Sequence, residues 1–315
     1  MSDERALHNQ KVHMRTIKIR CGLIAVSGWL SLCVAAAEGP PGGAQTSISL
    51  TPAYLASADI DGGGSYASRT LTLGIGTMKP VSARSMAGVS FNYTAYDNRF
   101  SGTNAFGVAK PWGDVERIGL SAPVIMRNDT GWAYMLIPTA DFLRERDADL
   151  GDSLTYGAIL SASRVYDPKH RFGIGLGVFQ QLEQVKVFPF LAVEWQLTDT
   201  LRLNNPLPAG PTGPAGLEIN YRLNPKWELG LGTVYRRVRF RLTDNGPYPG
   251  GVGEESGIVA FLHAATRVGD DVSLDLYGGA LFDGELQVED SGGHDIARHG
   301  FDTAPLLGAT VRRQF

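Results

Sequence analysis

Three arginines alternate with three apolar residues in RVRFRL, residues 237–242 of a 315-residue chain with a formal net charge of −3. Side chains on a β-strand point to opposite faces in turn, so the spacing predicts that Arg237, Arg239 and Arg241 share one face. Such a row of guanidinium groups can select solutes by charge or pair with carboxylates. Which of these it does depends on the solvent that each face meets.

The histidines that follow residue 37 offer little catalytic chemistry. His263 lies on a strand-like segment with Arg267, and no serine partner can be placed beside it from the sequence. His294 and His299 flank Asp295 in HDIARH, which could bind a metal, although the polar composition of a loop explains the motif more simply. An outer-membrane lipid hydrolase is therefore a minor alternative, and we predict no catalytic residue, no metal and no cofactor.

The chain begins with the layout of a secretory signal peptide. Basic Arg15, Lys18 and Arg20 precede an apolar run over residues 21–34, and three alanines follow. We predict cleavage after Ala37. The run of about 14 residues is shorter than the roughly 18 that a membrane-spanning helix needs. A lipoprotein signal at Cys33 is a weaker alternative because the preceding residue is a leucine.

This leader also bounds the chemistry of the exported part. It contains both cysteines, Cys21 and Cys33, so the rest of the chain has no disulfide and no cysteine metal site. It also removes more basic than acidic residues, and the acidic balance that remains argues against nucleic acid as a partner. We divide the chain into an N-terminal extension with signal peptide (1–37), a linker rich in Gly and Pro (38–45), and one barrel domain (46–315).

The barrel domain consists of alternating strands and turns, with no amphipathic helix of ordinary length. Strand segments run from TSISLTPAYL to TAPLLGATVRRQF, with a short one in TLRLNNP, residues 200–206. They number about 14, or 12 if two are lost, and short turns such as NPK alternate with long loops rich in Gly, Pro and Asp. The sequence predicts an all-β fold, a transmembrane antiparallel up-and-down meander β-barrel.

Aromatic residues support a membrane barrel. A group of them lies beside the short turns or at the C-terminus: Trp132, Trp195, Trp227, Tyr221 and Phe315. Amphipathic rings favour the headgroup layer, so we predict that these residues form a girdle at one membrane interface. The alternative is a soluble β-sandwich in which they are ordinary core aromatics.

The alternation of several strands assigns one face to lipid and the other to a partly polar interior. In DVSLDLYGGALF, for example, Val272, Leu274 and Leu276 oppose Ser273 and Asp275. An arginine on the lipid face costs about 2–4 kcal/mol at the bilayer midplane, which favours the interior for the arginine row. The candidate lumen-lining residues are Arg237, Arg239, Arg241, Glu218, Arg222, Glu194, Asp275, His263 and Arg267.

The strand that carries the arginine row poses a register problem. Trp227, Leu229 and Leu231 share the parity of Arg237, so the apolar face must switch within the strand. We infer a β-bulge near Arg236, since one extra residue would exchange the two faces. The alternative is that the row extends above the bilayer, where facing is unconstrained.

The chain after the leader resembles an outer-membrane β-barrel of Gram-negative bacteria. The stretch from GIGLGVFQQ through VFPFLAVEWQLTDTLRL to LEINYRLNPKWELGLGTVYRRVRFRL is similar in pattern to an uncharacterised family of such barrels. The terminal strand TAPLLGATVRRQF ends in Phe315 and is similar to the signal read by the barrel assembly machinery, although Arg313 replaces the usual apolar residue. The resemblance implies insertion into outer-membrane lipid by that machinery, and it transfers no site residues.

Two function classes remain open from the sequence. The first is a passive channel or transporter for small solutes with a charged lumen, because about 14 strands enclose more room than the eight-stranded barrels that side chains fill. The second is a plugged structural or surface-interaction barrel that acts through its long external loops.

Overall fold

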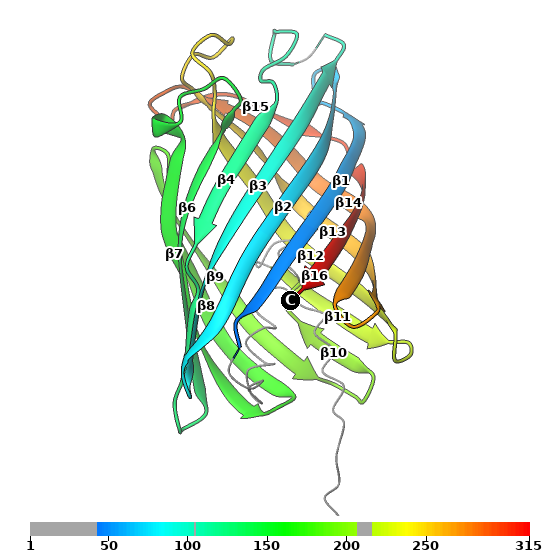
Figure 1. Cartoon of the computed structure of the whole chain (residues 1–315). Helices are drawn as coiled ribbons and strands as arrows, with labels where there is room; N and C mark the ends of the chain where they lie inside the picture. The colour runs from blue at the N-terminus through cyan, green and yellow to red at the C-terminus, as the bar shows by residue number, and fades with distance from the viewer. Residues whose placement is uncertain (1–42, 104, 207–215) are drawn as a thin grey trace, which may run out of the picture.

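A computed structural model describes residues 43–315 apart from residue 104 and residues 207–215. Its tilted strands form one closed barrel (Figure 1). No helix in this part of the chain is long and apolar enough to cross a membrane. The elements are β1 (Gln45–Asp59), β2 (Ser65–Ser82), β3 (Ser85–Ser101), β4 (Val115–Ser121), β5 (Val124–Arg127), β6 (Trp132–Glu145), η1 (Gly151–Ser153), β7 (Leu154–Asp167), β8 (His170–Gln181), β9 (Gln184–Gln196), β10 (Leu201–Asn204), β11 (Gly216–Arg222), β12 (Trp227–Arg241), β13 (Val252–Val268), β14 (Val272–Glu289), β15 (Asp295–Phe301) and β16 (Ala304–Gln314).

These strand segments make fourteen barrel strands. β4 and β5 both pair with β3 and β6 and form one interrupted strand, and β15 and β16 both pair with β14 in the same way. β16 then pairs with β1 and closes the ring. Each strand is antiparallel to its neighbours in the ring, so the predicted fourteen-strand meander is confirmed, including the short strand that begins at Leu201.

Connections of different length lie at the two ends of the barrel. Short turns lie at the lower end in Figure 1, and most of the long loops lie at the upper end. The β8–β9 turn is a short exception at the upper end, with Leu182 in the left-handed region at φ 55°. β1 begins at the end of the predicted linker, and the predicted leader lies outside the described residues.

The outward faces of β12, β13 and β14 carry an apolar band that ends at one level. On β12 the band runs from Trp227 to Tyr235. Tyr235 pairs directly with Ile258 of β13, which pairs in turn with Phe282 of β14, the last apolar outward residue there. Each strand contributes about 9–11 residues to the band, which is the length that a tilted transmembrane strand needs. All three strands continue upward beyond this band.

β10 and β11 are much shorter than their neighbours. They contain 4 and 7 residues, against 13 in β9 and 15 in β12. Within the described ladders, the upper edges of β9 and β12 therefore face each other across a gap without a strand between them. Asn205 caps the lower border of the gap, where its side chain accepts from the Val193 amide at 2.9 Å and donates to the Leu191 carbonyl at 2.7 Å.

Candidate functional site

Above the apolar band, β12–β15 continue as an upper extension of the barrel, which comprises residues 237–241, 252–257, 283–289 and β15. Its outward face is charged and includes Arg237, Arg239, Arg241, Glu254, Glu285 and Glu289. Its inward face is mostly apolar and includes Val238, Phe240, Leu286 and Val288, with Glu255 as a buried acidic member. The two faces are therefore inverted relative to the membrane band, where the apolar residues point outward.

This inversion explains the arginine row without any change of register between β12 and β13; the register shift at this level lies in the β13–β14 pairing, between Ser256 and Ile258. β12 pairs with β13 continuously along its whole length, so the predicted bulge near Arg236 is wrong. Arg237, Arg239 and Arg241 point outward like Tyr235. They differ from Tyr235 only in their height on the strand, because they lie above the apolar band. The structure thus places the row on the outer side of the wall, as in the second alternative that the sequence left open.

Arg239 is the centre of an ionic network on this outward face. Its two terminal nitrogens each donate to one carboxylate oxygen of Glu289 at 2.6 Å, and one also donates to Glu254 at 3.3 Å. Glu183, in the β8–β9 turn, lies 3.7 Å from Arg239 and also pairs with Arg241. This turn covers Arg239, which is only 4% exposed, and ties β9 to β12 across the gap above β10.

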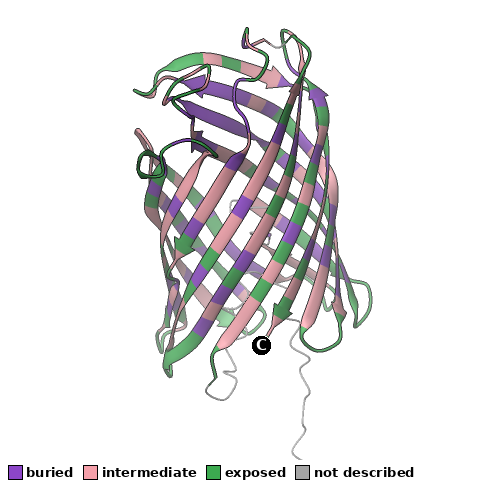
Figure 2. Cartoon of the chain, turned by 45° about the horizontal axis from the view of Figure 1, so that its top comes forward, coloured by how far each residue is buried: buried purple, intermediate pink, exposed green. Residues whose placement is uncertain are grey.

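Inside the extension and just beneath it, side chains from several walls meet in an apolar cluster that we call the mouth core. Its large members are Tyr66, Phe106, Trp112, Phe240, Phe261, Leu281, Leu286, Phe301 and Leu306. Trp112, from the β3–β4 loop, is 1% exposed and its ring lies 5.4 Å from that of Phe240, edge to face. Buried residues accordingly gather at the upper end of the barrel (Figure 2).

Hydrogen bonds join opposite walls of the barrel at its upper mouth. The carboxylate of Glu145, at the end of β6, accepts from the backbone amides of Gly113 at 2.6 Å and Thr243 at 3.0 Å. Arg241 donates from Nε to the carbonyl of Asp152 at 2.9 Å. β6 and β12 are far apart in the ring, yet a parallel bridge joins their upper ends. Contacts between the upper ends of β6 and β12 and their loops therefore span the upper mouth.

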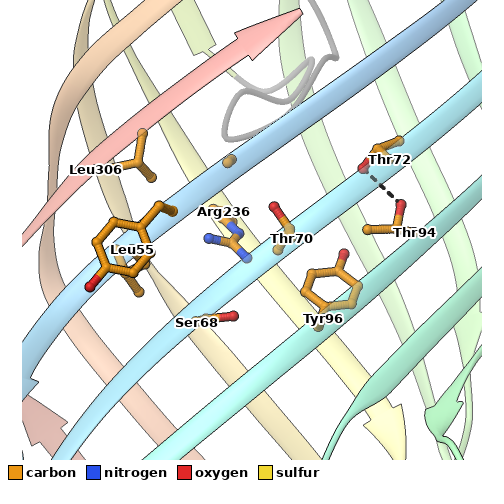
Figure 3. Close-up of a pocket in the computed structure, with 10 residues that line it drawn as sticks. Leu55, Ser68, Thr70, Thr72, Thr94, Tyr96, Arg236 and Leu306 are labelled. Carbon is orange, nitrogen blue, oxygen red and sulfur yellow. Dashed lines mark hydrogen bonds between the residues drawn. The ribbon is translucent and has the colours of Figure 1, made fainter.

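At the level of the mouth core, β12 reaches the opposite strands β2 and β3. Arg236 lies 3.2 Å from Glu255, which also accepts from the Tyr66 hydroxyl at 2.6 Å. A cavity of about 40 Å³ lies beside Arg236, and the hydroxyls of Thr70 and Thr72 border it (Figure 3). This volume suffices for one or two water molecules, which polar groups on both sides could hold.

Lower down, the interior has two walls of different chemistry. The first wall, on β16 and β1–β3, is mostly hydroxyl and amide, and its inward residues include Ser49, Thr51, Ser68, Thr70, Thr72, Ser90, Asn92, Thr94 and Thr310. The second wall, on β8–β14, is charged and includes Arg171, Glu194, Arg202, Glu218, Glu228, His263 and Asp275. A solute in the lumen would therefore meet neutral donors on one side and charges on the other.

Three of the predicted lumen residues, Glu218, His263 and Asp275, meet in one buried cluster. Nδ1 of His263 lies 2.8 Å from Glu218 and Nε2 lies 3.0 Å from Asp275, while the ring stacks on Tyr277 at 4.9 Å. Ionised carboxylates only accept hydrogen bonds, so this geometry suits an imidazole that donates from both ring nitrogens and carries a positive charge. Neither nitrogen is then available as a base, which argues against the hydrolase alternative.

Glu194 and Arg222 lie lower on the charged wall. Glu194 is 3.4 Å from Arg171 and 3.9 Å from Arg202, and Arg202 also pairs with Glu228 at 3.0 Å. Arg222 is exposed and lies opposite Glu228 in the β11–β12 ladder. Sequence reasoning missed Arg171 and Arg202, although the parity of Arg171 relative to the outward apolar residues of RFGIGLGVFQ was a usable signal.

Phe188 and Phe190 point inward but do not cross the lumen. They pair in register with Gly177 and Gly175 of β8, and a Cβ on either glycine would overlap the partner ring. Both rings therefore lie flat against their own wall, where the glycines leave room for them. The centre of the barrel stays clear of these two side chains.

The predicted girdle residues lie at strand ends on the lower side: Trp132, Trp195, Trp227, Tyr221 and Phe315. Their side chains are exposed, except that of Trp195, which is half-buried. Arg313 also points outward there, where it pairs with Asp271 at 2.9 Å and lies 4.8 Å from the centre of the Phe315 ring. This arrangement gives the charge of Arg313 a partner at the membrane margin.

No family model matches the chain, and none of the curated proteins is similar to it. Among solved structures, the COG4313 outer membrane channel from Pseudomonas putida F1 has a TM-score of 0.50 at 14% identity, over 88% of this chain and 97% of that one. The toluene transporter TodX from Pseudomonas putida has a TM-score of 0.43 at 9% identity, over 90% and 92%. The translocator domain of the autotransporter NalP from Neisseria meningitidis has a TM-score of 0.38 at 11% identity, over 89% and 92%. The similarity to the first of these shows the fold, which is that of outer-membrane β-barrels.

Proposed function

We propose that the chain is an outer-membrane channel for small solutes, closed at its upper mouth in the state described. The largely polar lining of the interior carries this proposal, since apolar side chains such as Met78, Ile125 and Met135 line only one part of it below the mouth. A barrel that only had to be filled would gain more from apolar side chains, because buried polar groups cost free energy unless they are hydrogen-bonded. Here a hydroxyl wall faces a charged wall, and the fourteen strands enclose more room than an eight-stranded barrel that side chains fill.

The apolar band, the aromatic residues at the lower end and the shared fold support a location in the outer membrane. The short turns correspond to the periplasmic side of bacterial barrels, so the upper mouth faces the exterior. We further propose that lipid covers the band and that the barrel assembly machinery reads β16 with the terminal Phe315.

The mouth core and the upper extension act as the gate in this proposal. The upper extension lies above the level at which Tyr235, Ile258 and Phe282 end the apolar band, and the mouth core reaches somewhat below that level at Phe261, Leu281 and Leu306. The contacts that close the mouth come from loops and from strand ends rather than from the ladders within the bilayer. Such elements can open locally while the rest of the barrel stays folded, as binding loops and lids do in other proteins.

Single-channel recording in planar bilayers tests the proposal, with protein purified from outer membranes and a Trp112→Ala variant. Removing a buried tryptophan from a core costs about 3–5 kcal/mol. The unmodified protein should open rarely, and the variant should open far more often because its closed state is weakened. Trp227→Ala is the matched control, since this tryptophan lies on the outer surface at the lower end and should leave the opening frequency unchanged.

A sealed surface-interaction barrel is the second candidate, and the interlocked upper mouth favours it. In that case the closure around Glu145 would be permanent, and the charged outward face of the upper extension would meet an external partner. Folded protein that conducts neither in its unmodified form nor with Trp112→Ala would overturn the channel and favour this candidate.

A further inference from the structure

Three phenylalanine rings form a flat apolar surface on the inner side of β8 and β9. The rings of Phe179 and Phe188 are stacked, with centroids 5.8 Å apart and an angle of 6° between their planes. Each ring lies over a glycine of a neighbouring strand, where an added Cβ would overlap it: Phe179 over Gly157, Phe188 over Gly177 and Phe190 over Gly175. The rings therefore turn their faces, not their edges, toward the lumen.

Apolar side chains extend this surface sideways along one register row. Phe188 pairs with Gly177 of β8, which pairs with Ile159 of β7, and Ile159 pairs in turn with Ile137 of β6. Phe188 and the two isoleucines are only half-buried, so a solute in the lumen can reach them. Neighbouring strands lie about 4.8 Å apart, so the row is about 14 Å wide, which is wider than one aromatic ring. We call Phe179, Phe188, Ile137 and Ile159 the apolar platform.

One lysine stands at the upper end of the apolar platform. Lys186 of β9 pairs directly with Phe179 and is half-buried on the inward side, since its neighbours Val185 and Val187 point outward and are exposed. In the part of the chain that the structure describes, the Lys186 ammonium makes no ion pair and no hydrogen bond. The sequence pointed instead to Arg267 as a lumen cation, and that residue lies inward at the lower end of β13.

The carboxylates that act on Lys186 are engaged by arginines. Glu289 accepts from both terminal nitrogens of Arg239 at 2.6 Å, and Glu254 accepts from Arg237 at 2.5 Å and from Arg239 at 3.3 Å. The same two arginines repel the charge of Lys186. An anion in the lumen can therefore approach the ammonium without displacing a bonded carboxylate.

We propose that Lys186 and the apolar platform bind organic anions with a flat apolar body, of which aromatic carboxylates are the simplest class. The carboxylate accepts from the ammonium in a charge-assisted hydrogen bond, and the ring lies on Phe188 in an offset stack. Arg237 begins the upper extension on β12, so its interaction with Lys186 puts the site directly beneath the gate. The inference rests on the proposed channel function and adds the solute class to it.

Isothermal titration calorimetry with benzoate tests the site in protein purified from outer membranes. Lys186→Gln removes the ammonium, and Phe188→Leu removes the ring but keeps an apolar side chain. The matched controls are Lys79→Gln and Phe172→Leu, because both residues are exposed on the outward faces of β2 and β8. The Kd for benzoate should rise about tenfold or more in Lys186→Gln and several-fold in Phe188→Leu, and it should stay unchanged in the controls.

Two further probes separate the two halves of the site. Acetate keeps the carboxylate and lacks the ring, whereas benzyl alcohol keeps the ring and lacks the charge, so both should bind much more weakly than benzoate. Acetate that binds as tightly as benzoate would contradict the role of the apolar platform. Benzoate that binds all five proteins equally, as it would by partition into detergent, or that binds none of them, would overturn the inference.

Current recordings in planar bilayers separate this inference from the channel function. Benzoate should reduce the potassium chloride current of the Trp112→Ala variant, and the added substitution Lys186→Gln should abolish that effect. Channels that conduct but neither respond to benzoate nor bind it would overturn the inference and leave the channel function standing. Folded barrels that stay silent would overturn the channel function, whereas binding of benzoate that depends on Lys186 would still support the site.

Discussion

Replacing Glu289 by glutamine tests whether the ionic network around Arg239 keeps the upper mouth closed. Glu289 is 2% exposed, and both its carboxylate oxygens accept from Arg239 at 2.6 Å. Glu289→Gln keeps the size of the side chain and removes its charge. Removing one partner of a buried ion pair costs about 3–5 kcal/mol when the other charge is left uncompensated, and Arg239 keeps Glu254 at 3.3 Å, so we expect the lower end of this range. If Arg239 returns to water when the extension opens, a loss of about 3 kcal/mol shifts the closed-to-open equilibrium by on the order of 10²-fold, since each 1.4 kcal/mol is tenfold.

The open fraction in single-channel recordings measures this shift. Glu285→Gln is the matched control on the same face of β14, because the side chain of Glu285 is 35% exposed and that of its partner Arg298 is 49% exposed. Such a surface pair contributes at most about 1 kcal/mol, so the control should change the open fraction by about fivefold or less. Equal effects of the two substitutions, or an unchanged open fraction in folded Glu289→Gln protein, would refute the role of the network in closing the mouth.

Three further outcomes follow from other parts of the structure. His263→Gln leaves Glu218 and Asp275 buried without a cation, and the barrel should lose about 3–5 kcal/mol of stability, seen as a lower urea midpoint; an unchanged midpoint would contradict the charged cluster. Gly177→Ala should push the Phe188 ring into the lumen and lower the single-channel conductance, whereas Gly278→Ala, where a Cβ meets only Leu307 at 3.6 Å, should leave it unchanged. In the β14–β15 loop, hydrogen bonds led by the His294 amide hold the pKa of Asp290 below its usual range. These hydrogen bonds should keep the loop ordered above the usual pKa of an aspartate, and the order should be lost as the pH falls through the lowered pKa of Asp290. An NMR titration of Asp290 with an ordinary midpoint would contradict this prediction.

The barrel could be predicted from the sequence because each feature behind it is local. Alternation along single strands, short turns such as NPK, and aromatic residues beside them are all readable without knowing which strands are neighbours. Even the four-residue strand at Leu201 could be predicted, because short turns and long loops alternate along the chain. Fold class and strand number therefore needed no tertiary information.

The arginine row was assigned to the lumen wrongly, because the alternation along β12 does not show at which residue the strand leaves the bilayer. β12 has 15 residues, more than the 9–11 or so that a transmembrane strand needs, so its upper part had to leave the membrane. Only the register of Tyr235 with Ile258 and Phe282 fixes where that happens.

The closed mouth and the buried histidine cluster depend on contacts between distant parts of the chain. Trp112 packs on Phe240, and His263 pairs with Glu218, across sequence separations that no local pattern reports. The sequence placed His263, Glu218 and Asp275 on inward faces one at a time. Their convergence becomes visible only once β11, β12, β13 and β14 are aligned in register.

The inverted faces of β12–β15 also predict how the molecule comes apart. The upper extension has a dry interior and a wet exterior, so it is in effect a piece of water-soluble β-protein that stands on a membrane barrel. Urea weakens apolar burial in water. The strands inside the bilayer instead keep their hydrogen bonds because an unpaired backbone group in hydrocarbon costs several kcal/mol. Denaturation in lipid should therefore proceed in two steps, in which the Trp112 environment melts first and the strand content of the wall is lost only afterwards.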